Sequence, residues 1–436
     1  MQHFVFYRWL IAIVFLSTLS LVSAQDLEPD GVIFRSDIDL LPGTDQGFGN
    51  DVSVDGEWAV VGASLHFGQD GQVYLFRRSE GSTAAWNFIK VLDRPAEPQN
   101  LFRFGQRVHL DGDWLAVTSS NSGTHLYHRN AGGDNNWGFS QRLVVDDISS
   151  RRDRDLDNDV VIAGNWLVIG AARTDYLNLG PDDGNDVGSV LIYELREQTW
   201  VIQQVLEFPE STIQPLARFG DRVAIEGDVL AVAAPEFSLA GFNEAGRVYV
   251  YQNRSTGWSL RRTLTPLSPK SVGRFGESVA VSGGVIAVGE ILGGDTQTPD
   301  VSNDGSIHVF ERDEGGPDNW GRVINLVPSE PEFINLFGQS VGLVGNLLLA
   351  GSQDGAYLFA NNGSWEEVDR NPVPTFADPS NVREFGFSAD LAVVNGGQQV
   401  IALLGDKTAE NSDDVRVGAA FFYAYDDGLF ADGFEQ

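Results

Sequence analysis

The chain has 436 residues, with 29 basic and 61 acidic side chains, a formal net charge of −32 at pH 7, and no cysteine. This acidic balance argues against binding to nucleic acid or anionic lipid and favours solubility outside the cell. Without cysteine, the fold must be held by its core and its backbone hydrogen bonds, with no disulfides.

Residues 1–24 have the composition of a secretory signal peptide. An apolar run follows Arg8, and Val22-Ser23-Ala24 forms a small-x-small cleavage signal. The run is shorter than the roughly 20 residues that a membrane-spanning helix needs, so an N-terminal anchor is the weaker alternative. No later stretch is apolar enough to span a membrane. We therefore expect cleavage after Ala24 and a secreted or surface-held chain.

One phrase recurs through the rest of the chain. It begins as FGNDVSVDGEWAVVGAS and starts near residues 48, 104, 156, 219, 275, 337 and 385. Two alternating apolar runs in each copy are separated by a pair such as Asp55-Gly56 or Glu226-Gly227, which predicts a β-hairpin with a two-residue type I′ turn. The third copy departs at its start, where Leu156-Asp157 replaces Phe-Gly.

Each hairpin is followed by a third apolar run, such as GQVYLFRR or GRVYVYQNR. A tryptophan then opens a fourth run in six copies: Trp86, Trp137, Trp200, Trp258, Trp320 and Trp365. Four antiparallel strands in a repeat of about 50–60 residues are the content of one propeller blade. The sequence therefore predicts an all-β fold, a seven-bladed β-propeller over residues 25–425.

The seventh copy lacks a fourth run. A matching segment, GVIFRSDIDLLPG, lies at residues 31–43, ahead of the first copy. Pairing this segment with the last blade would close the ring and remove an open strand edge. We therefore predict that both termini build the last blade.

The repeats resemble the FG-GAP repeat family, which builds the N-terminal propellers of integrin α-subunits and occurs in many secreted bacterial proteins. The resemblance rests on segments such as VVGAS and VIGAA and on six Phe-Gly pairs, at residues 48–49, 104–105, 219–220, 275–276, 337–338 and 385–386. Many members hold calcium in a loop between the first two strands of a blade, and two-residue turns cannot supply the about six to eight oxygen ligands that calcium requires. The chain therefore resembles the calcium-free bacterial variants, and we expect no cofactor.

No catalytic motif for zinc, nucleophilic or phosphate chemistry occurs in the chain. Four aspartates alternate in RRDRDLDNDV, and on an extended strand they would share one side as a weak cation site: Asp153, Asp155, Asp157 and Asp159. The alternative interpretation is a solvated linker entering the third blade. Spacing alone cannot select an acid pair for glycoside hydrolysis from 61 acids.

The connections between second and third strands are long and acidic, and antiparallel order places them on one face of the disc together with the links between blades. Binding residues commonly lie on such loops above a rigid scaffold, although long loops can also be unused. Our candidate ligand-binding residues are Asp182, Asp183, Asp186, Phe242, Glu244, Asp295, Asp300 and Asp304.

The chain ends in an acidic and aromatic tail, residues 426–436. Its FADGFE segment resembles a short tail at the ends of some exported proteobacterial proteins, which implies sorting or surface handling; a frayed polar terminus is the alternative. We expect a monomeric, secreted, non-catalytic module that binds an extracellular protein or glycan. The alternative is an extracellular hydrolase or lyase for a glycan or phosphoester, with acids at the channel mouth.

Overall fold

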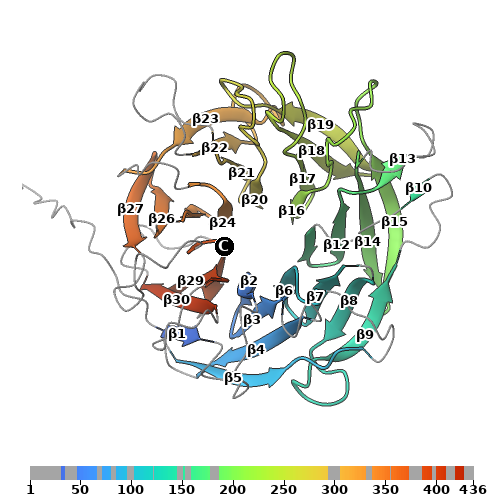
Figure 1. Cartoon of the computed structure of the whole chain (residues 1–436), viewed down its shortest axis with the longest axis vertical. Coiled ribbons are helices and arrows are strands. Elements are labelled where there is room, and N and C mark those ends of the chain that lie inside the picture. Colours follow the sequence, from blue (N-terminus) through green and yellow to red (C-terminus); the bar gives the residue numbers. More distant parts are fainter. Residues whose placement is uncertain are drawn as a thin grey trace, which may run out of the picture.

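The computed structural model arranges seven four-stranded antiparallel sheets as blades around a central channel (Figure 1). The predicted all-β fold and blade number are therefore confirmed. The structure describes residues 31–34, 47–65, 71–79, 85–95, 103–120, 122–144, 151–152, 159–176, 186–292, 305–329, 336–353, 355–372, 385–394, 399–408 and 418–426. The predicted signal peptide and the tail beyond Asp426 lie outside these residues.

Each blade runs from an innermost strand beside the channel to an outermost strand on the rim. Blade 1 comprises β2 (Phe48–Asp55), β3 (Trp58–Ala63), β4 (Gln72–Arg78) and β5 (Trp86–Val91). Blade 2 comprises β6 (Val108–Asp111), β7 (Trp114–Ser119), β8 (Gly123–His128) and β9 (Gly138–Leu143). Blade 3 comprises β11 (Asp159–Ala163), β12 (Trp166–Ala171), β14 (Ser189–Arg196) and β15 (Thr199–Glu207). Blades 4 and 5 comprise β16 (Arg222–Glu226), β17 (Val229–Ala234), β18 (Arg247–Arg254) and β19 (Gly257–Leu264), then β20 (Ser278–Ser282), β21 (Val285–Glu290), β22 (Ser306–Glu311) and β23 (Gly321–Leu326). Blade 6 comprises β24 (Ser340–Val344), β25 (Leu347–Gly351), β26 (Gly355–Asn361) and β27 (Trp365–Pro372).

Blade 7 is built from both ends of the chain, as predicted. Its strands are β28 (Ser388–Val394), β29 (Gln399–Asp406), β30 (Ala419–Asp426) and β1 (Gly31–Phe34). β1 pairs antiparallel with β30, from Gly31 opposite Phe422 to Phe34 opposite Ala419. The described closing strand is shorter than the predicted segment, whose remaining residues, 35–43, lie outside the described ranges.

The hairpin turns lie one residue later than predicted. Asp55 pairs with Trp58, so the central turn residues are Gly56 and Glu57 rather than Asp55 and Gly56. Gly56 has φ +57°, and Glu57 is not among the residues with positive φ. A positive φ at the first central position alone belongs to the type II′ turn, so the type I′ prediction was wrong for this hairpin.

The repeated Phe-Gly and Gly-Ala segments bring neighbouring blades into contact. Phe48 is fully buried and packs edge-on against Tyr74 of its own blade, with ring centroids 5.2 Å apart. Gly62 approaches the next blade so closely that a Cβ atom there would collide with the carbonyl oxygen of Gly105. The repeated residues are therefore requirements of blade packing, and they explain the fold rather than a ligand.

The two faces of the disc differ in the length of their connections. In blade 4 the turn between β16 and β17 is two residues, Gly227 and Asp228, whereas residues 235–246 join β17 to β18. We call the face with the connections between second and third strands the long-loop face, and the opposite one the short-turn face. A small additional ribbon pairs β10 (Arg151–Arg152) with β13 (Asp175–Tyr176) beside blade 3, and the sequence did not predict it.

Candidate functional site

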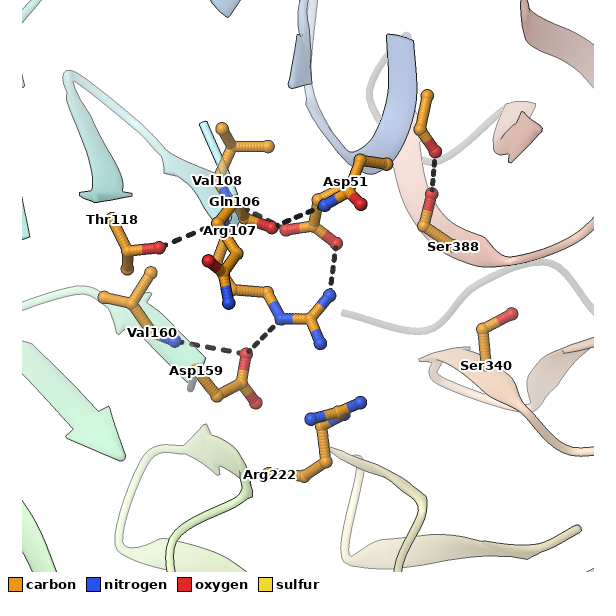
Figure 2. Close-up of polar contacts among 12 residues, drawn as sticks. Asp51, Gln106, Arg107, Val108, Thr118, Asp159, Val160, Arg222, Ser340 and Ser388 are labelled. Carbon is orange, nitrogen blue, oxygen red and sulfur yellow. Dashed lines mark hydrogen bonds and ion pairs between the residues drawn. The ribbon is translucent and has the colours of Figure 1, made fainter. Parts of the chain in front are cut away.

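The innermost strands bring one residue of each repeat together around the channel at the long-loop face. These residues occupy the fourth position of each phrase, and we call them the channel ring: Asp51, Arg107, Asp159, Arg222, Ser278, Ser340 and Ser388. Blades 1 to 4 thus contribute charges of alternating sign, and blades 5 to 7 contribute serines. Figure 2 shows the ring residues Asp51, Arg107, Asp159, Arg222, Ser340 and Ser388 around the opening.

The ring aspartates bind the backbone of the following blade. Asp51 Oδ2 accepts a hydrogen bond of 2.8 Å from the amide of Val108, and Asp159 Oδ2 accepts one of 2.9 Å from the amide of Val223. Among the strands that the structure describes, the innermost strands of different blades form no ladder with each other. A carboxylate at this position therefore links two blades where backbone pairing does not.

The ring arginines lie between acids, and three of the four ion pairs described next are longer than hydrogen bonds. Arg107 Nη1 is 3.7 Å from Asp51 Oδ1, and its Nε is 4.0 Å from Asp159 Oδ1. Arg222 Nη1 donates a 2.8 Å hydrogen bond to Asp221 Oδ2, while its Nη2 is 3.8 Å from Glu277 Oε1. Charge-assisted hydrogen bonds are typically about 2.7–2.9 Å long, so three of these four ion pairs are loose.

The ring serines make the same link between blades with the direction of donation reversed. Ser278 Oγ donates to the carbonyl oxygen of Gly338 at 2.7 Å, and Ser340 Oγ donates to that of Gly386 at 2.7 Å. Ser388 Oγ donates to the carbonyl oxygen of Gly49 at 3.1 Å and so joins blade 7 to blade 1. Blades 5 to 7 are therefore connected at this level without charge.

Two cavities lined by residues that the structure describes lie in the channel. The one at the long-loop mouth has a volume of about 350 Å³ and is lined by ring residues together with Arg274, Glu277 and the apolar side chains of Leu336 and Phe387. The deeper one has a volume of about 220 Å³, and its lining includes His109 and Asp390. The mouth cavity lies within the size range of small-molecule sites.

Burial in the channel shifts the pKa values of several groups. It raises the pKa of Asp51 to about 7, although the Arg107 guanidinium acts in the opposite direction. It raises the pKa of Asp390 to about 6 and lowers that of His109 to about 4. The pKa of Arg222 is raised because Asp221 and neighbouring acids outweigh its burial, so Arg222 stays charged. In each case burial disfavours the charged form of the group.

Further carboxylates at the short-turn end of the channel also hold neighbouring blades. Asp55 Oδ2 accepts a 2.7 Å hydrogen bond from the amide of Gly112, and Asp111 Oδ2 accepts one of 2.9 Å from that of Gly164. Their positions explain why acids recur before the turn glycines. Substitutions there are expected to change stability, so these residues are poor controls for binding.

A buried polar cluster lies within blade 5. His308 Nε2 is 2.6 Å from Glu290 Oε2, and Arg322 Nη1 contacts His308 Nδ1. Because the guanidinium can only donate, Nδ1 accepts and Nε2 carries the proton that it gives to Glu290. Burial raises the pKa of Glu290 to about 8. His308 and Glu290 are 2 % and 1 % exposed, so the cluster belongs to the core of the blade.

The structure places only some of the predicted loop residues. Phe242 is 40 % exposed on the long-loop face, and Glu244 Oε2 lies 3.6 Å from Arg274 Nε at the channel mouth. The backbone carbonyl of Asp186 accepts a 3.1 Å hydrogen bond from the amide of Arg218. Asp182, Asp183, Asp295, Asp300 and Asp304 lie outside the described residues.

The predicted cation site is described at one residue only. Asp159 is a ring residue whose carboxylate accepts backbone amides, while Asp153, Asp155 and Asp157 lie outside the described residues. Within the part of the chain that the structure describes, no group of three or more histidine and acidic side chains could hold a metal ion. Asp159 therefore belongs to the channel.

Sequence reasoning missed the channel ring as a candidate site. The signal was present, because the fourth residue of successive phrases reads Asp, Arg, Asp, Arg, Ser, Ser, Ser. Aligning the copies on their glycines and reading this column would have found it. The cavity itself could not be found in this way, since its size depends on how far the innermost strands lie from the channel axis.

Comparison with known proteins agrees with the architecture. Residues 258–310, which include the phrase that starts at Phe275, match the family model of the FG-GAP repeat. No curated protein matches the chain. Across the described residues, no helix is long and apolar enough to cross a membrane. With one repeat matched and its phrase repeated through a closed seven-bladed ring, the chain is an FG-GAP repeat β-propeller.

Proposed function

We propose that the chain is an extracellular, non-catalytic binding or adhesion module that engages its partner through the long-loop face. The FG-GAP propeller fold is suited to such a role, because it presents loops on a rigid disc. The apolar run and cleavage signal of residues 1–24 support export. Fractionation of cells that express a C-terminally tagged full chain tests the export component.

The observation that carries the proposal is the asymmetry of the two faces. In blade 4, residues 235–246 expose Phe242 and bring Glu244 to the rim of the channel mouth, whereas the opposite end of the blade is a two-residue turn. An exposed aromatic ring beside charged groups is a common composition of a binding surface. The same proposal assigns partner contacts to the remaining acidic loop residues: Asp182, Asp183, Asp186, Asp295, Asp300 and Asp304.

The test compares one glutamate on each face. Glu244 and Glu197 both have positive φ, at +51° and +49°, and Glu197 lies in the turn between β14 and β15 on the short-turn face. The purified chain is immobilised and probed with a defined panel of extracellular glycans and matrix proteins, as wild type, Glu244→Gln and Glu197→Gln. We expect binding to at least one panel member, weakened several-fold by Glu244→Gln and unchanged by Glu197→Gln. No binding to any member, or equal loss in both variants, counts against the proposal.

A second candidate function is an extracellular hydrolase or lyase for a glycan or phosphoester. The gathering of Asp51, Asp159 and Glu277 at the channel mouth favours it. Against it, the carboxylates of Asp51 and Asp159 already accept backbone amides of the next blade, which gives them a role in holding the ring. Release of reducing sugar or phosphate by the wild type, abolished by Asp51→Asn at unchanged melting temperature, would favour the enzyme.

A further inference from the structure

We propose that the long-loop mouth of the channel binds a small hydroxylated monocarboxylate, a sugar acid, with its carboxylate between Arg107 and Arg222. The inference goes beyond the proposed binding by the loops, because a small molecule in the channel and a macromolecule on the loops use different residues. It rests on the size of the cavity, on its hydrogen-bond donors and on its charge balance.

The arginines supply the donors. Arg107 lies 3.7 and 4.0 Å from carboxylate oxygens of Asp51 and Asp159, and Arg222 Nη2 lies 3.8 Å from Glu277 Oε1. Figure 2 shows both guanidinium groups directed into the opening. Planar guanidinium groups match the two oxygens of a carboxylate, so a ligand carboxylate between them would form charge-assisted hydrogen bonds with both.

The ring acids do not compete strongly for these donors. Asp51 and Asp159 each direct an oxygen at a backbone amide of the following blade, at 2.8 and 2.9 Å. Asp159 Oδ1 also accepts a 3.1 Å hydrogen bond from the amide of Val160. Their geometry is therefore fixed by the blades, and they hold the arginines near the opening without closing on them.

The charge balance selects the kind of anion. The mouth cavity is lined by three acids, Asp51, Asp159 and Glu277, and three arginines, Arg107, Arg222 and Arg274. Because these formal charges cancel, the cavity offers no net attraction to a second negative charge, while a dianion such as sulfate costs more to desolvate than a monocarboxylate. The site therefore favours a single carboxylate.

The serines across the opening favour hydroxyl groups on the ligand. Ser340 and Ser388 line the mouth cavity on the side opposite Arg107 and Arg222 (Figure 2). Each hydroxyl donates its hydrogen to a backbone carbonyl, of Gly386 and of Gly49 respectively. The serine oxygens keep lone pairs that can accept a hydrogen bond from a ligand hydroxyl.

Isothermal titration with D-glucuronate, D-glucose and inorganic sulfate tests the proposal. The chain is used as wild type, Arg222→Gln and the matched control Arg312→Gln, which removes an arginine paired with Asp228 on the short-turn face. We expect glucuronate to bind more tightly than glucose or sulfate. Arg222→Gln should weaken glucuronate by about tenfold or more, which is the loss of one charge-assisted hydrogen bond, and Arg312→Gln should leave it unchanged.

If Arg222→Gln does not fold, Arg107→Gln takes its place, with the melting temperature measured for each variant. The proposal is overturned if glucuronate does not bind the wild type or if glucose or sulfate binds as tightly. It is also overturned if the channel substitution and the control Arg312→Gln change glucuronate binding equally. The loop-face panel is read out with Glu244→Gln and the glucuronate titration with Arg222→Gln, so that failure of the loop-face proposal can be told from failure of this one. A galacturonate trimer separates the two sources of the ligand: binding of the trimer indicates the end of an acidic polysaccharide, and binding of the monomer alone indicates a free sugar acid.

Discussion

The two halves of the propeller solve the same structural problem with different chemistry. Each blade must be joined to the next beside the channel, where backbone ladders are absent between blades. In blades 1 to 4 the ring position is Asp51, Arg107, Asp159 and Arg222, whereas in blades 5 to 7 it is Ser278, Ser340 and Ser388. The three serines donate hydrogen bonds of 2.7–3.1 Å to carbonyl oxygens of the following blade. The charged half keeps long ion pairs at the opening.

The halves also differ at the short-turn end of the blade interfaces. Three edge-on tryptophan pairs with centroid separations of 5.5–5.6 Å join blades 1 to 4: Trp58 with Trp137, Trp114 with Trp200, and Trp166 with Trp258. The interfaces between blades 4 and 5 and between blades 5 and 6 instead place an aliphatic residue in the same apolar cluster as the tryptophan, Val229 with Trp320 and Val285 with Trp365. Aromatic pairs add energy beyond the area they bury, so the half with the loose polar mouth has the stronger apolar contact beneath it. The repeated phrase therefore determines the scaffold, while the type of side chain at the ring position varies from blade to blade.

The largest effect is expected from removing the strand that closes the serine half. Deletion of residues 31–43 removes β1 from β30 and leaves a long unpaired edge on blade 7. We expect aggregation or edge-to-edge dimers and a melting temperature lower by about 10 °C or more. Size-exclusion chromatography and a thermal melt measure both, with deletion of residues 427–436 as the control. A monomeric variant with an unchanged melting temperature would contradict the closure by β1.

The next effect separates the two kinds of ring residue. Arg222→Gln removes an arginine that is paired with both Asp221 and Glu277, and we expect the free energy of unfolding to fall by about 2 kcal/mol. Ser340→Ala removes one hydrogen bond to Gly386 and should cost about 1 kcal/mol. Urea denaturation of both variants measures the difference. Equal losses of unfolding free energy in the two variants would show that charged and serine ring residues contribute equally to stability.

A smaller effect is expected from pH. The pKa of Asp51 is raised to about 7 and that of Asp390 to about 6, from a usual value of 3.8, because burial disfavours the carboxylate. The folded state therefore binds protons that the unfolded state has released, and this contribution to stability is complete below pH 3.8 and lost as the pH rises through 6 and 7. We expect the melting temperature to fall between pH 5 and pH 8.

Asp390→Asn sharpens the pH experiment, because it removes one of the two groups and leaves the others in place. Its fall in melting temperature between pH 5 and pH 8 should be smaller than that of the wild type by about 1–3 °C. The side-chain oxygen of asparagine can still accept the 2.8 Å hydrogen bond that the amide of Val54 donates to Asp390. An identical pH dependence in both proteins would show that Asp390 does not titrate in this range.

The smallest effect is expected from calcium. In blades 1 to 6 the turns between first and second strands have two residues, as in Gly56-Glu57 and Gly227-Asp228, which is too short for a calcium loop. Thermal melts in EDTA and in millimolar calcium should coincide within about 1–2 °C. An increase of more than about 10 °C with calcium would show a site that binds the folded state, in either half of the ring.

The repeated phrase was sufficient to predict the blades, because each spacing that recurs among the copies corresponds to a packing requirement. Gly62 must lie against Gly105 of the next blade, and Phe48 must pack against Tyr74, so the spacing of these residues is visible in the sequence. The turn type could not be read from the same pattern. The sequence shows that a glycine is present, but only the strand register shows that Gly56 is the first central residue.

The candidate site was less predictable, because it depends on residues that meet only when the ring closes. Asp51 and Arg222 are far apart in the sequence and lie in non-adjacent blades, yet both line one cavity. The loop residues were found by length and charge, and of these the structure describes Phe242, Glu244 and Asp186. A repeat pattern predicts where equivalent positions lie, while the choice of side chain at each position decides what the channel can bind.

A crystal structure of the chain grown with D-glucuronate would show where the ligand lies. We expect the channel mouth to bind it, with the charged half holding the carboxylate and the serine half facing its hydroxyl groups, while the short-turn face serves as scaffold. The account predicts density for the sugar acid in the mouth cavity, with its carboxylate within hydrogen-bond distance of Arg107 and Arg222 and a hydroxyl facing Ser340 or Ser388. Density on the short-turn face, or an empty mouth at a ligand concentration that saturates the protein in solution, would contradict it.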